Sequence, residues 1–134
     1  MLRPVVAGAP VAVSKKILLV DDEAGMRRSL AIMLRREHYQ VTETGAVAEA
    51  VGRLKGERYD LVVADLRMEP LDGFDLLTLA RQYADCPVVI VTAFGSPEAR
   101  AEALRRGAVE FLEKPLDAAQ LLARVRELLE GHGG

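Results

Sequence analysis

Hydrophobic and polar residues form blocks along the chain, and each apolar block stops at a polar residue. Uncharged runs at 17–20, 61–64 and 87–91 are rich in β-branched residues, which is typical of strands buried on both faces of a parallel sheet. Residues 39–43 alternate between polar and apolar, which predicts an edge strand. Residues 109–112 predict a short strand of mixed polarity.

The segments between these runs carry apolar residues at the three-to-four-residue spacing of amphipathic helices. The predicted inward faces are Met26, Leu30, Met33 and Leu34; Val47, Ala50, Val51 and Leu54; Phe74, Leu77 and Ala80 or Arg81; Ala99, Ala103 and Leu104; and Leu121, Leu122, Val125, Leu128 and Leu129. Ser96, followed by Pro97, and Asp117 predict helix N-caps, while Gly56 and Gly107 predict helix ends.

Strands therefore alternate with helices along the whole chain, which predicts an α/β fold with a parallel sheet and helices on both faces. The length of 134 residues suits one domain. We expect this domain to span residues 15–130, with a flexible N-terminal arm over 1–14 and a frayed tail over 131–134.

Composition narrows the function classes. A net charge of -2 provides no basic field, so direct nucleic-acid binding is not expected. No apolar run approaches 18 residues, so no membrane span is expected. Cys86 is the only cysteine, which excludes an internal disulfide and predicts a reducing, cytoplasmic location. We expect Cys86 itself to be a small buried hydrophobe.

Polar residues with chemical potential follow the predicted strands at the point where each one ends. Asp65 closes the run at 61–64, Asp21 and Asp22 close the first run, and Thr92 closes the fourth. Lys114 follows the fifth strand after a short interval. Because the carboxyl ends of parallel strands lie at one edge of a sheet, we expect these residues to converge there.

Three carboxylates held together would repel one another, and a hard divalent cation such as Mg²⁺ relieves that conflict. Lys114 adds a mobile positive charge and Thr92 adds a hydroxyl donor. The set predicts a phosphoryl-transfer site in which the Asp65 carboxylate attacks phosphorus and becomes an acyl phosphate. Singly, each residue is commonplace at a turn, cap or loop; the joint pattern is what favours function.

With these motifs in place, residues 15–130 strongly resemble the receiver domain of bacterial two-component response regulators. The motifs that carry the resemblance are Ile17–Glu23, Leu61–Asp65, Asp72-Gly73, Val91–Ala93 and Gly107–Pro115. The resemblance implies a flavodoxin-like, CheY-like (βα)5 fold with strand order 2-1-3-4-5.

The resemblance also implies roles for individual residues. Asp65 corresponds to the phosphoacceptor, which takes its phosphoryl group from the phosphohistidine of a sensor histidine kinase or phosphotransfer protein. Asp22 and Asp65 correspond to direct Mg²⁺ ligands, together with the main-chain carbonyl of Arg67. Asp21 corresponds to the acid that binds the metal through water. Self-phosphorylation and self-dephosphorylation would be the only catalysis, so an enzyme in the usual sense is not expected.

Further implied roles concern signalling. Thr92 and Phe111 correspond to the switch pair, in which the hydroxyl moves to the phosphate and the ring turns inward. Lys114 corresponds to the phosphate-binding lysine, followed by a cis bond to Pro115. The helix between Ser96 and Gly107, the fifth strand and the last helix form the implied signalling face, which could also support a homodimer. The output domain or target is expected outside this chain.

Three departures from the family pattern lie near the acceptor. Residues 68–70 are Met-Glu-Pro where the family usually has Met-Pro, and Glu69 adds negative charge. Arg67 lies two residues after Asp65, and Phe94 lies two residues after Thr92, where a polar residue is frequent. We hypothesise that Arg67 and Phe94 shield the acyl phosphate from water and lengthen its lifetime.

Three other functions deserve comparison. An aspartyl phosphatase usually carries a second Asp two residues after its nucleophile, where this chain has Arg67. A flavodoxin-like FMN carrier needs a Ser/Thr/Gly-rich loop after the first strand, where this chain has Asp21, Asp22 and Glu23. A receiver-shaped interaction module that is never phosphorylated would be distinguished by its failure to react with acetyl phosphate.

Overall fold

The five predicted strands form one parallel sheet, as their pattern predicted, in the order β2-β1-β3-β4-β5 that the family resemblance implied. The strands are β1 (Lys16–Val20), β2 (Gln40–Thr44), β3 (Leu61–Ala64), β4 (Val88–Thr92) and β5 (Glu110–Glu113). The structure, a computed structural model, describes residues 14–130. The expected arm over 1–14, apart from Ser14, and the expected tail over 131–134 lie outside the described residues.

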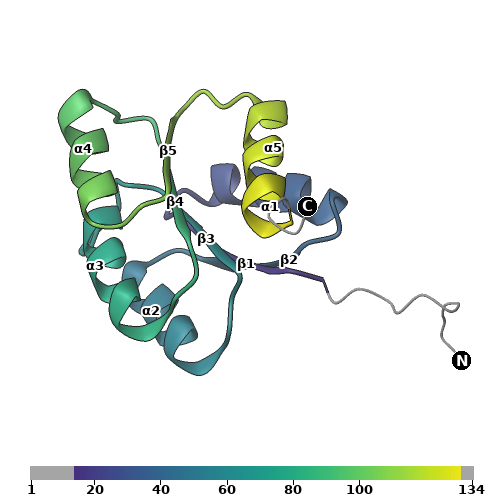
Figure 1. Cartoon of the computed structure of the whole chain (residues 1–134), viewed down its shortest axis with the longest axis horizontal. Coiled ribbons are helices and arrows are strands. Elements are labelled where there is room, and N and C mark those ends of the chain that lie inside the picture. The colour runs from purple at the N-terminus through teal and green to yellow at the C-terminus, as the bar shows by residue number, and fades with distance from the viewer. Residues whose placement is uncertain (1–13, 131–134) are drawn as a thin grey trace, which may run out of the picture.

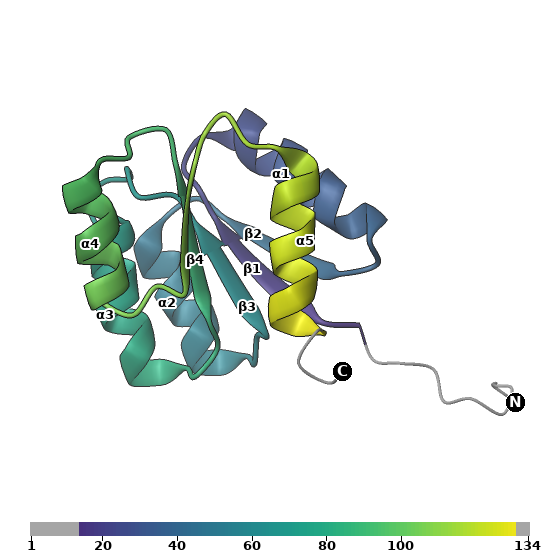
Figure 2. The same ribbon diagram turned by 45° about the horizontal axis from the view of Figure 1, so that its top comes forward.

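Helices cover both faces of the sheet (Figure 1). They are α1 (Ala24–Arg36), α2 (Val47–Gly56), α3 (Gly73–Tyr83), α4 (Pro97–Arg105) and α5 (Ala118–Leu129). Helices α1 and α5 lie on one face, and α2, α3 and α4 lie on the other, which the turned view makes clear (Figure 2). Within residues 14–130, no helix has both the length and the apolar content that crossing a bilayer requires.

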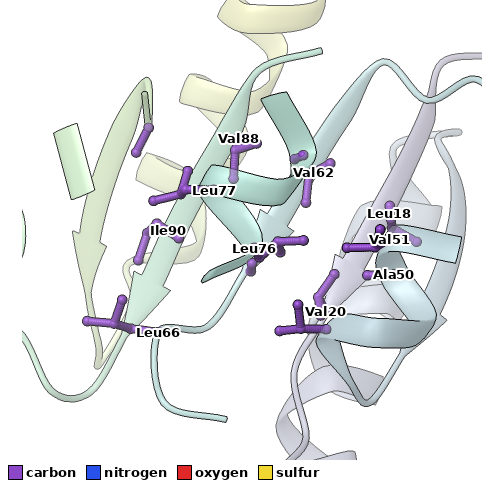
Figure 3. Packing of buried hydrophobic residues seen from close by; sticks show 14 of the residues in the cluster. Leu18, Val20, Ala50, Val51, Val62, Leu66, Leu76, Leu77, Val88 and Ile90 are labelled. Carbon is purple, nitrogen blue, oxygen red and sulfur yellow. The ribbon is translucent and has the colours of Figure 1, made fainter. Parts of the chain in front are cut away.

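The central strands are apolar throughout because both of their faces are buried. In β1, Leu18 and Val20 pack into the cluster beneath α2 and α3, while Ile17 and Leu19 pack into the cluster beneath α1 and α5. Figure 3 shows the first cluster, with the β1 side chains beside those of α2. Burying each such side chain contributes roughly 1.5–3 kcal/mol, so the sheet is anchored from both sides.

Strand β2 lies at the edge of the sheet, as its alternating pattern predicted. Gln40 is exposed, the next three residues are half-buried, and only Thr44 is buried. The two ends of α4 and the start of α5 also follow the sequence. The Ser96 and Asp117 side chains accept hydrogen bonds from the first turns of α4 and α5, and Gly107 takes a φ of 109° just beyond α4.

Several predicted helix faces need correction. Leu104 was expected to face inward but is 42% exposed, because α4 meets the core along a narrow line on which only Ala103 is buried. Met26 was expected in the core but is 36% exposed and lines an open groove with Leu116. On α3, Leu76 is fully buried although its spacing did not single it out.

Candidate functional site

At the carboxyl edge of the sheet, hydrogen bonds fix the backbone one residue beyond β1, β3 and β5. The Asp65 N–H donates to the Val20 carbonyl at 2.9 Å, and the Asp21 N–H donates to Thr44 at 3.1 Å. The Lys114 N–H donates to the Thr92 carbonyl at 2.8 Å. The hydrogen-bond pattern of the sheet therefore extends to the backbones of Asp21, Asp65 and Lys114 and fixes them.

Lys114 joins three strand ends. Its ammonium Nζ lies 3.1 Å from Oδ2 of Asp65 and 3.4 Å from Oδ2 of Asp21. The three side chains are each no more than a tenth exposed. The structure thus brings together three of the residues that the sequence placed at this edge, from β1, β3 and the segment after β5.

Burial and charge act against each other here. Burial raises the pKa of Asp21, and this outweighs the Glu23 N–H bond and the Lys114 charge, which both lower it. Burial lowers the pKa of Lys114, but attraction from Asp21 and Asp65 outweighs it, so the pKa of Lys114 is raised. The lysine therefore remains protonated at neutral pH and supplies a fixed positive charge next to Asp65.

Asp65 is held from the side of α3 as well. Its Oδ1 accepts the Arg67 N–H at 3.1 Å. A Cβ at Gly73 would lie 2.6 Å from the Asp65 carbonyl oxygen, so only glycine allows the start of α3 to approach this closely. The Gly73 N–H in turn donates to Leu66 at 2.9 Å, and Asp72 caps the helix. This close approach accounts for the Asp72-Gly73 motif.

Thr92 and Phe111 are both buried, the aromatic residue to 2% exposure. The Thr92 hydroxyl oxygen accepts the Phe94 N–H at 3.0 Å, which leaves its own proton free to be donated. Within residues 14–130 the hydroxyl makes no hydrogen bond to Asp65 or Lys114. The Phe111 ring packs into the cluster beneath α2, α3 and α4, in the inward position that the resemblance assigns to the switched form.

Asp22 is not gathered with the other acids. Its side chain is exposed and lines an open hollow of about 510 Å³ with Glu69 and Phe94, among others. Across the described part of the chain, no three His, Cys, Asp or Glu side chains are grouped closely enough to hold a metal ion. The expected convergence is therefore seen for Asp21 and Asp65, while Asp22 lies at the rim.

The two departures that flank the acceptor contact each other. The guanidinium carbon of Arg67 lies 4.1 Å from the centre of the Phe94 ring, in a cation–π arrangement. Phe94 is 53% exposed, so the pair forms one wall of the hollow beside Asp22. The Lys114–Pro115 bond is cis, as the resemblance implied, and the Glu69–Pro70 bond is cis too.

Sequence reasoning missed one neighbour of the site. The Arg27 guanidinium donates to the Asp21 main-chain carbonyl at 2.6 Å and to Glu43 at 3.2 Å. Its side chain is only 19% exposed. The one available signal was Glu43 itself, the single charged residue of the edge strand, for which a basic partner is expected.

Similarity to known proteins agrees with this geometry. Residues 17–126 match the family model described as the response regulator receiver domain. The chain is 34% identical over 114 residues to the transcriptional regulatory protein ResD of Bacillus subtilis, a match that covers 85% of this chain and 48% of that protein. It is 36% identical over 115 residues to the transcriptional regulatory protein GlrR of Escherichia coli, covering 85% and 26%.

Among solved structures, a two-component response regulator from Clostridium difficile superposes with a TM-score of 0.86 at 26% identity, covering 90% of this chain and all of that one. The chain spans about half the length of ResD and about a quarter of GlrR. The family match extends over most of the chain and includes every residue singled out at the sheet edge. This chain therefore belongs to the receiver domain family of two-component response regulators.

Proposed function

We propose that Asp65 is the phosphoacceptor of this receiver domain and takes its phosphoryl group from the phosphohistidine of a sensor histidine kinase or phosphotransfer protein. The observation that supports this most strongly is the buried Lys114 ammonium, 3.1 Å from Asp65 and 3.4 Å from Asp21. It provides a positive charge where charge on a transferring phosphoryl group would develop.

In the proposed step, a carboxylate oxygen of Asp65 attacks phosphorus and forms a P–O bond. The P–N bond to the histidine breaks, and its electron pair stays on the imidazole nitrogen, which can then take up a proton. In this step Lys114 and the Thr92 hydroxyl would donate to phosphoryl oxygens; within residues 14–130 the hydroxyl accepts from Phe94 and donates no hydrogen bond, which supports this role. The chain would promote its own phosphorylation and dephosphorylation and no other reaction.

A magnesium ion fits the donors at this edge. The atoms that could ligate the metal are carboxylate and main-chain carbonyl oxygens, the ligand type that Mg²⁺ prefers. The carboxylates of Asp21 and Asp65 share the single positive charge of Lys114, so one negative charge is left unbalanced. We propose that Asp22, Asp65 and the Arg67 carbonyl hold the ion directly, with Asp21 acting through water. When bound, Mg²⁺ supplies further neutralisation of the phosphoryl charge.

The signalling output follows from α4, β5 and α5. We propose that contact of the Thr92 hydroxyl with the phosphoryl group fixes the buried position of Phe111 and shifts the face formed by these three elements. That face would bind a target, or a second copy of the chain in a homodimer. Since ResD and GlrR are both longer and are named transcriptional regulatory proteins, a cytoplasmic transcriptional output outside this chain is the favoured target.

The test is incubation with Mg²⁺ and acetyl phosphate, followed by electrophoresis in a gel that retards phosphoproteins. The wild type should give a retarded band that disappears with Asp65→Asn. Asp85→Asn, which changes an exposed acid two residues beyond the C-terminal end of α3, should behave as the wild type. A wild type that stays unmodified, or an Asp65→Asn variant that is still modified, would overturn the proposal.

A further inference from the structure

The Arg27 side chain contacts the main chain of the loop between β1 and α1, which carries Asp21 and Asp22. It lies in the first turns of α1, and its Nη1 donates to the Asp21 main-chain carbonyl at 2.6 Å. That carbonyl follows β1, where no further strand hydrogen bond is available to it. A buried carbonyl without a partner costs free energy, so the guanidinium completes the backbone pairing of Asp21.

All the polar groups of Asp21 are then paired. Its N–H donates to the Thr44 carbonyl at 3.1 Å, and its Oδ1 accepts the Glu23 N–H at 2.9 Å. Its Oδ2 faces Lys114 at 3.4 Å. Arg27 makes the only one of these four contacts that comes from a helix side chain, and it ties the loop directly to α1.

Glu43 holds the guanidinium in place. It lies on β2 with a side chain that is 12% exposed, and Nε of Arg27 donates to it at 3.2 Å. Arg28 and Arg35 also pair with Glu43, at 3.2 and 3.3 Å. Those two are far more exposed, and within residues 14–130 they make no hydrogen bond to Asp21. The three arginines thus share one carboxylate, but only Arg27 links it to the site.

The space for this link is provided by Gly45. A Cβ at position 45 would lie 3.2 Å from Nη1 of Arg27 and 4.0 Å from the Asp21 carbonyl oxygen. A side chain at position 45 would therefore press on the guanidinium. The sequence thus contributes an arginine, a carboxylate and a glycine, from α1, β2 and the loop after β2, to one contact.

We propose that Arg27 is a positioning residue for the phosphoryl-transfer reaction, acting through Asp21. By fixing the Asp21 carbonyl it sets the course of the β1–α1 loop, and so the placement of Asp21 and Asp22 for a divalent cation. The inference rests on the proposed function. It goes beyond that function in assigning a role to a side chain that touches neither phosphate nor metal.

The test compares Arg27→Ala with Arg28→Ala, which removes a neighbouring arginine from the same carboxylate but not from Asp21. Mn²⁺ binding to the unphosphorylated protein is measured directly by electron paramagnetic resonance. We expect Arg27→Ala to weaken it about tenfold, the lower end of the range typical when support of a metal ligand is lost. Arg28→Ala should leave it within about twofold of the wild type.

The second measurement separates the half-saturating Mg²⁺ concentration from the phosphorylation rate at saturating Mg²⁺. With acetyl phosphate as donor, Arg27→Ala should raise the half-saturating Mg²⁺ concentration while the rate at saturating Mg²⁺ changes little. Arg27→Lys, which keeps a charged donor, should recover part of the affinity. A merely structural role would instead lower stability, read by urea unfolding, without this split or the recovery.

Gly45→Ala keeps the proposal testable if Arg27→Ala fails to fold. It should shift Mn²⁺ affinity in the same direction by a smaller factor. Equal Mn²⁺ affinity in Arg27→Ala and Arg28→Ala, or, where Arg27→Ala does not fold, an unchanged affinity in Gly45→Ala, would refute the role of Arg27. A wild type that binds no Mn²⁺ and takes up no phosphate would instead refute the proposed function, so the two failures are distinct.

Discussion

Helices α1 and α4 both begin just after a strand end that carries a site residue, yet they are attached to the molecule by different means. Helix α1 has three buried residues, Leu30, Ala31 and Leu34, which pack into the cluster it shares with α5. Helix α4 has one, Ala103. Helix α4 shares its face of the sheet with α2 and α3 (Figure 1), and these two helices supply most of the helix side chains in the cluster on that face.

Polar contacts replace the missing apolar ones on α4. Arg100 donates to the Phe111 carbonyl at 3.0 Å. Arg106, just beyond the helix, donates to the Phe74 carbonyl at 3.1 Å and to Thr78 at 3.2 Å. Each such hydrogen bond contributes little net free energy, because water can replace the protein partner. Removing a buried leucine from contact with the core costs considerably more.

The firm packing of α1 and the sparse packing of α4 suit the different tasks of the residues beside them in the proposed reaction. On the α1 side, Arg27 donates to the Asp21 main-chain carbonyl and buried residues anchor the helix. In the proposed reaction, this keeps Asp21 in position while the charge beside it changes. The α4 side carries Thr92, whose hydroxyl must find a new partner. An element with few buried contacts opens at low free-energy cost, so α4 is the one that can shift.

The largest expected effect comes from truncating a leucine on α1, compared with the same truncation on α4. Leu34→Ala on α1 removes a fully buried side chain and should lower the free energy of unfolding by about 2–5 kcal/mol. Leu104→Ala on α4, at 42% exposure, should change it by no more than about 0.5 kcal/mol. Urea unfolding measures both. Similar losses would mean that α4 is as firmly packed as α1.

The next effect concerns the ionic anchor of α1. Burial would raise the pKa of Glu43, but hydrogen bonds and attraction from Arg27, Arg28 and Arg35 outweigh it, so the pKa is lowered from 4.5. A lowered folded-state pKa means that this stabilisation is fully present above pH 4.5 and is lost as pH falls through the folded value.

Glu43→Gln should therefore cost about 1.5–3 kcal/mol at pH 7, and the difference from wild type should shrink as pH is lowered below 4.5. Unfolding free energies at a series of pH values test this. Glu98→Gln, at an exposed acid on α4, is the matched control and should change the free energy of unfolding at pH 7 by no more than about 0.5 kcal/mol. A constant difference between Glu43→Gln and wild type would show that the carboxylate charge does not anchor α1.

A smaller effect is expected for the polar tether of α4. Arg100→Ala removes the bond to Phe111, worth about 0.5–1.5 kcal/mol, so α4 amides should exchange hydrogen roughly twofold to tenfold faster. Arg105→Ala, whose side chain is 67% exposed and pairs with Glu102 on the same helix, should leave exchange unchanged. Equal exchange in both variants would remove Arg100 from the attachment of α4.

The same contrast explains what the sequence could predict about the fold. The strands at 17–20 and 61–64 were predictable because an uncharged run leaves no face that tolerates water. The core face of α4 was predicted in part, since Ala103 is buried and Ala99 packs against the core as expected. Leu104 was misplaced because a helix with one buried residue has almost no apolar period to detect.

The site divides in a similar way. Asp21, Asp65 and Lys114 were predicted to converge because strand ends fix their backbones, and they do. The exposure of Asp22 depends on loop conformation beyond the strand end, which no residue pattern encodes. The Arg27 contact escaped prediction because its acceptor is a main-chain carbonyl, which every residue has.

The smallest expected effect tests the α4 side of the acceptor. The Phe94 ring under the Arg67 guanidinium is 53% exposed, and an exposed cation–π pair contributes about 0.5–1 kcal/mol. If the pair shields the acyl phosphate, Phe94→Ala should shorten the phosphate lifetime roughly twofold to fivefold. The decay of acetyl-phosphate-labelled protein after removal of the donor measures it.

Tyr83→Ala is a suitable control, because Tyr83 is 43% exposed and lies under Lys55 at 4.7 Å, away from the hollow that Phe94 lines. It should leave the lifetime unchanged. A Phe94→Ala protein that keeps its phosphate as long as the wild type, or longer, would show that the exposed pair does not exclude water. Protection would then have to come from the buried groups around Asp65, and the two sides of the site would differ in mobility alone.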